Sequence, residues 1–228
     1  MNTKLILLDI RSLINRSVVF LFPPFLLKLM EIFLFPPFFL LAKWRIEPYS
    51  KLHLGCGTNI LKGGWANIDL SGGLNVIKWD CTKRLPVKSG TIRLIFSEHF
   101  LEHINMQEGR KFLSECYRVI QPGGVLRIST PNLKKCIDEY LLGYASEWRN
   151  IEYSENTGPL YTPCRMMNES MRLWGHKFVY DLEELNKLLK EIGFSSVTEV
   201  AWHESKHEEL KNIECRPFGG EIILEIVK

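Results

Sequence analysis

The chain lacks the paired cysteines that typically bind zinc or form disulfides. It contains no Cys-x-x-Cys pair, and no cleavage pattern of a secretory signal follows its N-terminus. The cysteines are Cys56, Cys81, Cys116, Cys136, Cys164 and Cys215. Scattered cysteines without a secretion signal are typical of reduced thiols, so we expect a cytoplasmic protein without structural zinc or disulfides.

The chain also carries little excess charge. Its 228 residues have a formal net charge of +3, and residues 1–50 alone hold an excess of three basic side chains, so the remainder is neutral overall. A neutral domain argues against a broad nucleic-acid-binding surface. The length allows one sizeable core with an appendage, and 46% hydrophobic with 24% charged residues is ordinary for a folded domain.

Residues 1–46 differ from the rest and form a hydrophobic N-terminal arm. Ser17–Ala42 is almost wholly apolar and holds an imperfect repeat, Phe20–Leu27 and Phe33–Leu40, with a proline pair in each copy. Proline pairs break helices, so a straight membrane-spanning helix is disfavoured. We expect short broken helices in one leaflet, with residues 17–42 attaching the protein to the inner face of the membrane. The alternatives are packing on its own domain, packing on a second subunit of a homodimer, and a true span.

Short apolar runs alternate with helical patterns in the rest of the chain. The expected strands are Leu52–Leu54, Ala66–Leu70, Asn75–Trp79, Ile92–Phe96, Val125–Ser129, Ser196–Trp202 and Glu221–Val227. This alternation predicts an α/β domain over residues 47–228, with a Rossmann-like, seven-stranded, mostly parallel sheet and helices on both faces. No helix is obvious between the last two strands, so they predict an antiparallel edge. The irregular residues 143–175 suit an inserted substrate loop or lid.

A glycine turn follows the first expected strand, in the order Leu54-Gly55-Cys56-Gly57. Glycine has no Cβ, so the backbone can turn tightly and let a ligand lie against bare N–H and C=O groups. The second expected strand ends on Asp69, whose carboxylate could accept hydrogen bonds from two ribose hydroxyls. This order is how a Rossmann-like sheet presents a nucleoside ligand at the carboxyl ends of its strands.

These motifs, together with Ser97–His103 and Glu115–Leu126, resemble the class I S-adenosylmethionine-dependent methyltransferases, specifically their methyltransferase-type-11-like members. The resemblance covers about residues 51–228 and implies methyltransferase activity with S-adenosylmethionine as cofactor. The residues that it implies for cofactor binding are Leu54, Gly55, Cys56, Gly57, Asp69, Leu70, Asp80, Cys81, Ser97 and Glu98. His53 stands where the family often has an acid, and Arg93 where its fourth strand often has Asp, so the methionine end of the cofactor could be held differently.

Methyl transfer to an oxygen requires removal of a proton, and histidine suits that near neutral pH. The family geometry implies that His99, just past the fourth strand, faces the methyl group, whereas His176 enters from the opposite side after the variable loop. Both are candidate catalytic bases. The alternatives are a hydrogen-bonding role beside Glu98 for His99 and ordering of the helix after Asp181 for His176. His103 lies four residues from His99, but without a His-Glu-x-x-His pattern the sequence predicts no metal.

The leading prediction is therefore an O-methyltransferase that acts on a small-molecule or lipid-linked acceptor, such as a sugar or a secondary metabolite. The hydrophobic arm alone motivates the lipid-linked version. One alternative is an NAD-dependent Rossmann oxidoreductase, although Ile60 stands in the place of the third glycine of the Gly-x-Gly-x-x-Gly fingerprint. The other is a cofactor-binding interaction module without turnover.

Overall fold

The computed structural model describes residues 37–143, 162–216 and 220–228. They form a seven-stranded sheet in the order β3-β2-β1-β4-β5-β7-β6. Strands β1 to β5 are parallel, and β7 runs antiparallel to both β5 and β6. The strands are β1 Lys51–Leu54, β2 Trp65–Asp69, β3 Ile77–Lys78, β4 Ile92–Glu98, β5 Ile120–Thr130, β6 Ser196–Glu199 and β7 Ile222–Val227. The predicted fold class is confirmed, including the antiparallel pairing of the last two strands.

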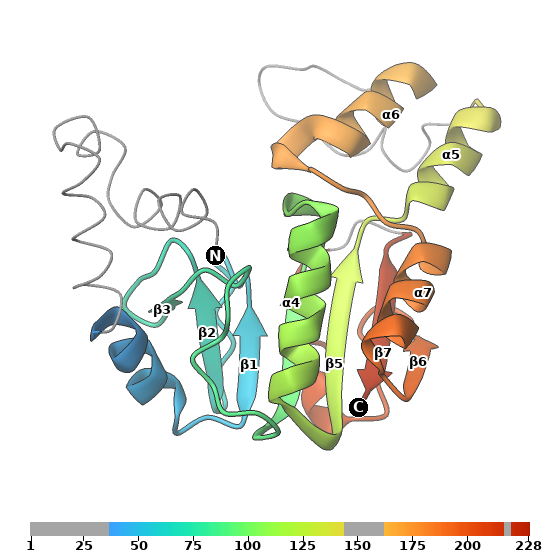
Figure 1. The fold of residues 1–228 in the computed structure, drawn as a ribbon. Coiled ribbons are helices and arrows are strands. Elements are labelled where there is room, and N and C mark those ends of the chain that lie inside the picture. The colour runs from blue at the N-terminus through green and yellow to red at the C-terminus, as the bar shows by residue number, and fades with distance from the viewer. Residues whose placement is uncertain (1–36, 144–161, 217–219) are drawn as a thin grey trace, which may run out of the picture.

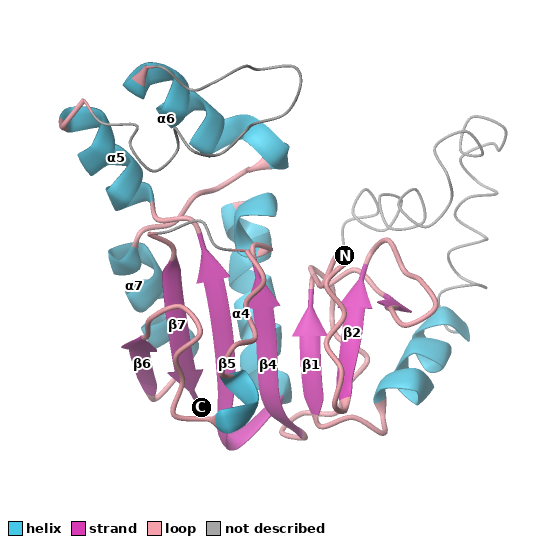
Figure 2. Cartoon of the chain, turned by 180° about the vertical axis from the view of Figure 1, so that it is seen from behind, coloured by secondary structure: helices cyan, strands magenta, loops and turns pink. Residues whose placement is uncertain are grey.

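Helices lie mainly on one face of the sheet and above its carboxyl edge (Figure 1, Figure 2). The longer helices are α4 Met106–Val119, α5 Leu133–Leu141, α6 Pro163–Arg172 and α7 Leu182–Ile192, and the short 3₁₀ helices are η1 Leu101–His103, η3 Leu173–Gly175 and η4 Glu208–Leu210. Helices α4 and α7 pack beside each other behind β4, β5 and β7 in Figure 2. The opposite face is covered by the loop that contains η4, whose Leu210 and Ile213 pack with Leu94 and Phe96. The connection between β1 and β2 contains no helix, in agreement with the prediction from its few residues that this helix is short or replaced by a loop.

Helix α4 shows why the local sequence forms this architecture. Its buried side chains recur at helical spacing and include Phe112, Leu113 and Cys116, which face the sheet. Asn105 begins the helix with a capping box, because its side chain accepts from the N–H of Glu108 while the Glu108 carboxylate accepts from the N–H of Asn105. Both bonds satisfy donors that the first turn leaves without partners in the helix.

Part of the arm is packed against the domain. Residues 37–46 are helical, and Ala42 and Ile46 are 4% and 1% exposed within the main core. The ring of Phe39 lies edge-on to that of Trp79, with centroids 5.8 Å apart. For these ten residues, packing on the same domain is therefore observed, whereas the rest of the predicted arm lies outside the described residues. Large side chains of this helix remain exposed, namely Phe38, Leu40, Leu41 and Trp44.

Several boundaries differ from the sequence-based prediction. Strand β3 contains only Ile77 and Lys78, because an isolated bridge between Gly73 and Val76 forms a turn where the longer strand was expected. Strand β5 begins at Ile120, before the Pro-Gly-Gly turn signal rather than after it. The predicted insertion over 143–175 contains helix α6, and its residues 144–161 lie outside the described part of the chain. Among the residues that are described, no helix has the length and apolar character needed to cross a bilayer.

Candidate active site

The glycine turn after β1 has a backbone that other residues would strain. Gly55 and Gly57 have φ angles of +68° and +53°. The N–H groups of Gly55 and Cys56 both donate to the carbonyl of Ile68, at 2.9 and 3.2 Å, which ties the turn to the end of β2. A Cβ on Gly55 would lie 2.4 Å from the ring of Phe100. The turn therefore packs closely on the residue that precedes η1, and glycine is required there.

Asp69 lies at the carboxyl end of β2 and faces this turn. Its Oδ2 accepts from the N–H of Gly57 at 2.9 Å, and its Oδ1 accepts from both the N–H and the hydroxyl of Ser71 at 2.8 and 2.7 Å. Burial acts to raise the pKa of Asp69, but these bonds outweigh it and lower the pKa below its usual value. A carboxylate has about four acceptor positions, so one remains on Oδ2. The next residue, Leu70, is 41% exposed beside it.

The loop after β3 holds its own acid in a turn. Asp80 Oδ1 accepts from the N–H and the hydroxyl of Thr82 at 2.9 and 2.7 Å. Burial raises the pKa of the neighbouring Cys81 thiol, and a hydrogen bond with the backbone of Gly55 opposes that rise. Burial and the charge of Asp69 raise the pKa of Cys56 to about 12. Both thiols are therefore protonated, and neither is a nucleophile at neutral pH.

The end of β4 fastens a late segment of the chain to the same edge of the sheet. The hydroxyl of Ser97 donates to the carbonyl of Leu54 at 2.9 Å. The Glu98 carboxylate accepts from the N–H groups of Cys215 and Arg216 at 2.8 and 3.1 Å. The guanidinium of Arg216 reaches the glycine turn, since its Nη2 would lie 3.7 Å from a Cβ on Gly57. This places a cation beside the turn.

His53 is turned toward the neighbouring strand. It is 1% exposed, and its Nδ1 lies 3.2 Å from Oδ1 of Asn67. Burial lowers the pKa of His53 to about 4, so the imidazole is neutral at physiological pH. It therefore contributes no charge to the site.

His99 lies between two carboxylates just after β4. Its Nδ1 is 3.0 Å from Glu102 Oε1, and its Nε2 is 3.2 Å from Glu221 Oε1. Burial acts to lower the pKa of His99, but the hydrogen bonds and charges of the two glutamates raise it to about 9. Both ring nitrogens thus donate to carboxylates in the protonated form, and the residue adopts a φ of +48° to do so.

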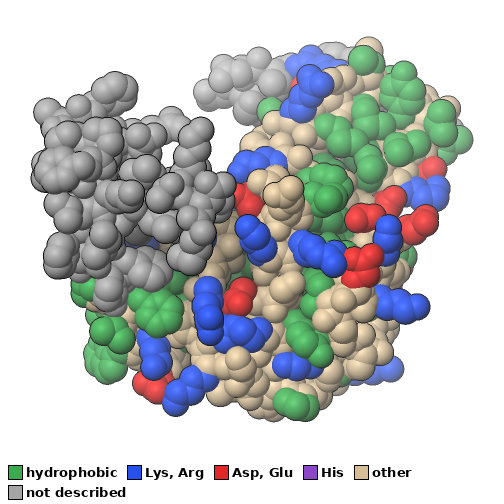
Figure 3. Space-filling view, in the orientation of Figure 1, with side chains coloured by type: hydrophobic (Ala, Val, Ile, Leu, Met, Phe, Trp, Pro, Cys, Tyr) green, Lys and Arg blue, Asp and Glu red, His purple; other side chains and the backbone are tan. Residues whose placement is uncertain are grey.

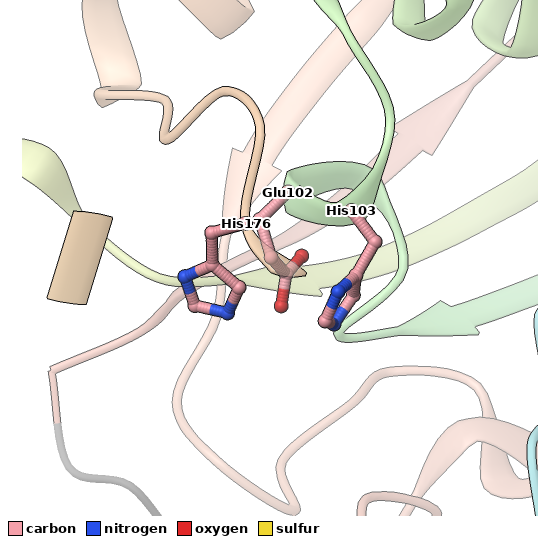
Figure 4. A group of neighbouring side chains, drawn as sticks. All are labelled: Glu102, His103 and His176. Carbon is pink, nitrogen blue, oxygen red and sulfur yellow. The ribbon is translucent and has the colours of Figure 1, made fainter. Parts of the chain in front are cut away.

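His176 approaches the same place from the segment after η3. Its Nδ1 lies 2.7 Å from the carbonyl oxygen of Ser170, and a carbonyl can only accept, so Nδ1 carries the hydrogen. Its Nε2 then has a lone pair. The ring lies edge-on to that of His103, with centroids 5.0 Å apart. Figure 4 shows these two imidazoles on either side of the Glu102 carboxylate. The N–H groups of the next two residues donate to the carbonyl of Glu102, which fixes this approach.

Comparison with known proteins identifies the domain. Residues 52–128 match a family model described as a methyltransferase domain, over β1, the glycine turn, Asp69 and most of β5. These residues, about a third of the chain, are therefore similar to the class I S-adenosylmethionine-dependent methyltransferases. This family is one of enzymes, and its cofactor is S-adenosylmethionine.

Known proteins with this description are similar to the chain over a short stretch or at low sequence identity. A probable S-adenosylmethionine-dependent methyltransferase of Mycolicibacterium smegmatis is 40% identical over 48 residues, which are 21% of this chain and 18% of that protein. The match thus spans about a fifth of that relative's length. A methyltransferase structure from Archaeoglobus fulgidus has a TM-score of 0.47 at 18% identity, covering 83% of this chain and 94% of that one. One from Thermotoga maritima, described as a possible histamine N-methyltransferase, has a TM-score of 0.46 at 16% identity, covering 83% and 89%.

The residues at this edge of the sheet fit S-adenosylmethionine in their chemistry. The remaining acceptor position on Asp69 suits a ribose hydroxyl, and the Arg216 guanidinium suits the carboxylate at the methionine end. Bare backbone at Gly57 lies between these two charged groups. Arg216 belongs to no sequence motif and follows a long loop, so the sequence alone did not indicate that it lies at this site.

The structure brings most of the sequence-predicted residues to one edge of the sheet. The glycine turn, Asp69 and Ser97 are joined there by hydrogen bonds, whereas the carboxylate of Glu98 is engaged by the backbone of residues 215–216. The two predicted bases, His99 and His176, meet around Glu102. The catalytic and binding roles of all these residues remain predictions.

Proposed function

We propose that the protein transfers the methyl group of S-adenosylmethionine to an oxygen atom of a small-molecule or lipid-linked acceptor, such as a sugar. When bound, the cofactor supplies a methyl group on a positively charged sulfur, which passes to the acceptor oxygen as the S–C bond breaks and S-adenosylhomocysteine is left. The observation that carries the proposal is the lone pair of His176 beside the Glu102 carboxylate at the carboxyl edge of the sheet. Phe100 packs on Gly55 two residues before Glu102, so this group adjoins the cofactor turn.

Three parts of the chain would hold the cofactor. The backbone of the glycine turn leaves room for close approach, and Asp69 would accept a hydrogen bond from the ribose. Arg216 would pair with the methionine carboxylate. A charge-assisted bond of this kind is stronger than a neutral one and fixes orientation.

Of the two candidate bases, the geometry favours His176. Both nitrogens of His99 face carboxylate oxygens, so in this arrangement His99 has no lone pair for an acceptor proton. Nε2 of His176 has one, because its Nδ1 hydrogen is held by Ser170. A positioned base contributes about 10²- to 10⁴-fold to the rate of a reaction that needs proton removal. His99 would then position Glu102 rather than accept the proton.

The helix at residues 37–46 motivates the lipid-linked version of the acceptor. Its exposed side chains Phe38, Leu41 and Trp44 are apolar, and Lys43 and Arg45 lie on the same helix. Figure 3 shows hydrophobic and basic side chains together at the lower left, where Figure 1 places this helix. This combination suits the surface of an anionic membrane. We therefore propose peripheral attachment to the inner face of the membrane through this helix.

The test follows label from methyl-labelled S-adenosylmethionine into a lipid extract of the source organism, presented as anionic vesicles. Wild-type protein should label a lipid-linked acceptor, and Trp44→Glu should label it about tenfold less, because a large side chain no longer enters the interface. Trp202→Glu is the matched control, since Trp202 is 43% exposed elsewhere on the domain. In the same assay His176→Ala should transfer at least about 100-fold less label.

The outcomes separate the parts of the proposal. Equal labelling by wild type and Trp44→Glu would exclude membrane attachment through this helix. Label that enters only water-soluble sugars would replace the lipid-linked acceptor with a free one. If label enters no acceptor in either fraction while the protein binds S-adenosylhomocysteine, the non-catalytic interaction module would be the better description.

A further inference from the structure

Three potential metal ligands converge beside the cofactor turn. Glu102, His103 and His176 each offer one ligand atom, and these atoms all lie within 4.8 Å of one another. Figure 4 shows the carboxylate between the two imidazoles. Glu102 and His103 lie on η1, and His176 reaches them from the far end of the α6 segment. The sequence alone predicts no metal, because the third ligand is distant along the chain and completes no local pattern.

The ligand atoms are held in place by partners of the kind that surround bound metals. The Glu102 carboxylate is 0% exposed, and it accepts from His99 at 3.0 Å and from the hydroxyl of Thr130 at 3.1 Å. His176 donates its Nδ1 hydrogen to the carbonyl of Ser170, which leaves Nε2 with its lone pair. Metal-binding histidines typically donate their other ring N–H to a carbonyl or carboxylate, which fixes the tautomer and the ring orientation.

The geometry points to a binding site for one divalent transition-metal ion, formed by Glu102, His103 and His176. Two imidazole nitrogens and one carboxylate oxygen suit Zn²⁺ and Fe²⁺, and three protein ligands leave coordination positions open. Packing alone gives no reason for the His103 imidazole, which makes no hydrogen bond within the described parts of the chain and faces a second imidazole. Both histidines are half-buried, so the open positions would be reachable from solvent.

A role for the ion follows if the proposed methyl transfer to oxygen is correct, and this step rests on that proposal. A hydroxyl of the acceptor would bind at an open position, where the cation lowers the pKa of the hydroxyl. The hydroxyl proton would pass to solvent water, and the oxygen would form its bond to the methyl carbon as the S–C bond breaks. In the metal-bound protein the His176 lone pair would bind the ion, so the ion would replace His176 as the group that activates the hydroxyl, and methyl transfer to oxygen itself would be unchanged.

The test uses full-length, untagged protein that has been treated with EDTA and titrated with Co²⁺, followed by the visible absorption of the bound ion. We expect one Co²⁺ per chain, displaced by Zn²⁺. His103→Ala and His176→Ala should each weaken binding by at least about 100-fold, and Thr130→Val by about 10- to 100-fold, since it removes only a partner of Glu102. His207→Ala is the matched control, because His207 is exposed and lies outside the cluster.

The proposal would be overturned if the wild-type protein bound no Co²⁺. It would also be overturned if the wild type, His103→Ala and His176→Ala bound Co²⁺ with equal affinity. Calorimetry with S-adenosylhomocysteine on the EDTA-treated protein separates this result from a failure of the proposed function. If the protein binds S-adenosylhomocysteine but not Co²⁺, the proposed metal site is wrong and the proposed methyltransferase function stands. Circular dichroism shows whether a variant is folded. If the variants are unfolded, the number of Co²⁺ ions bound per wild-type chain and their displacement by Zn²⁺ decide whether the site exists.

Discussion

Arg127→Met should lower the free energy of unfolding by about 3–5 kcal/mol, as expected when one member of a buried ion-pair network is removed. Arg127 lies on β5 and is 0% exposed. Its Nε donates to Glu214 at 2.5 Å and its Nη1 to Glu225 at 2.6 Å. The substitution leaves two carboxylates buried without their cation. Urea denaturation, followed by circular dichroism, measures the change.

The matched control removes the stranded charges as well. The triple variant Arg127→Met, Glu214→Gln, Glu225→Gln should recover a large part of the lost stability, because no unpaired carboxylate remains. A loss below about 1 kcal/mol for Arg127→Met alone would contradict the buried network. Glu214 directly precedes Cys215, whose N–H donates to Glu98, so the network also anchors the segment that reaches the cofactor edge.

Gly55→Ala should weaken the binding of S-adenosylhomocysteine by at least about 100-fold. The φ of +68° strains any residue with a Cβ by about 1–3 kcal/mol, and that Cβ would lie 2.4 Å from the Phe100 ring. Neither the turn nor η1 can keep its place after this change. Isothermal titration calorimetry measures the affinity, and the far-ultraviolet circular dichroism shows whether the domain remains folded.

Gly90→Ala is the matched control for backbone strain. Gly90 has the same φ of +68°, but a Cβ there meets no atom within 4 Å of it. Gly90→Ala should therefore show the effect of backbone strain alone. We expect a modest loss of stability and an unchanged affinity for S-adenosylhomocysteine. If Gly55→Ala bound S-adenosylhomocysteine as tightly as Gly90→Ala, the close packing of the turn on Phe100 would not matter for the cofactor.

The sheet and the glycine turn could be predicted because their signals are local. The apolar runs have strand length, the stripe of α4 has helical spacing, and Gly-x-Gly followed by a strand that ends on Asp69 lies within a short span of the chain. Strand β3 was predicted too long because the glycine pair marks the start of a turn but does not show that this turn continues to Val76.

The convergence at the site could not be predicted, because it depends on contacts between distant residues. His176 meets Glu102 only after the chain has passed through α5 and α6, and Arg216 reaches Gly57 because Arg127 and Glu98 fix the segment around it. The spacing of apolar residues along the sequence gives no information about contacts between such distant residues. The same limit applies to Ile46, which is 1% exposed in the core. Because it follows many other apolar residues of the arm, the sequence does not show that this residue packs on the domain.

The most direct test of the central claim is a calorimetric titration of S-adenosylhomocysteine into the wild-type protein and into Asp69→Ala. We expect one site per chain for the wild type, and binding weaker by about 1–3 kcal/mol for Asp69→Ala, because a charged acceptor of hydrogen bonds is lost. NAD⁺ should produce no binding heat. Wild-type protein that binds NAD⁺ but not S-adenosylhomocysteine, or an Asp69→Ala variant with the wild-type affinity, would contradict the account.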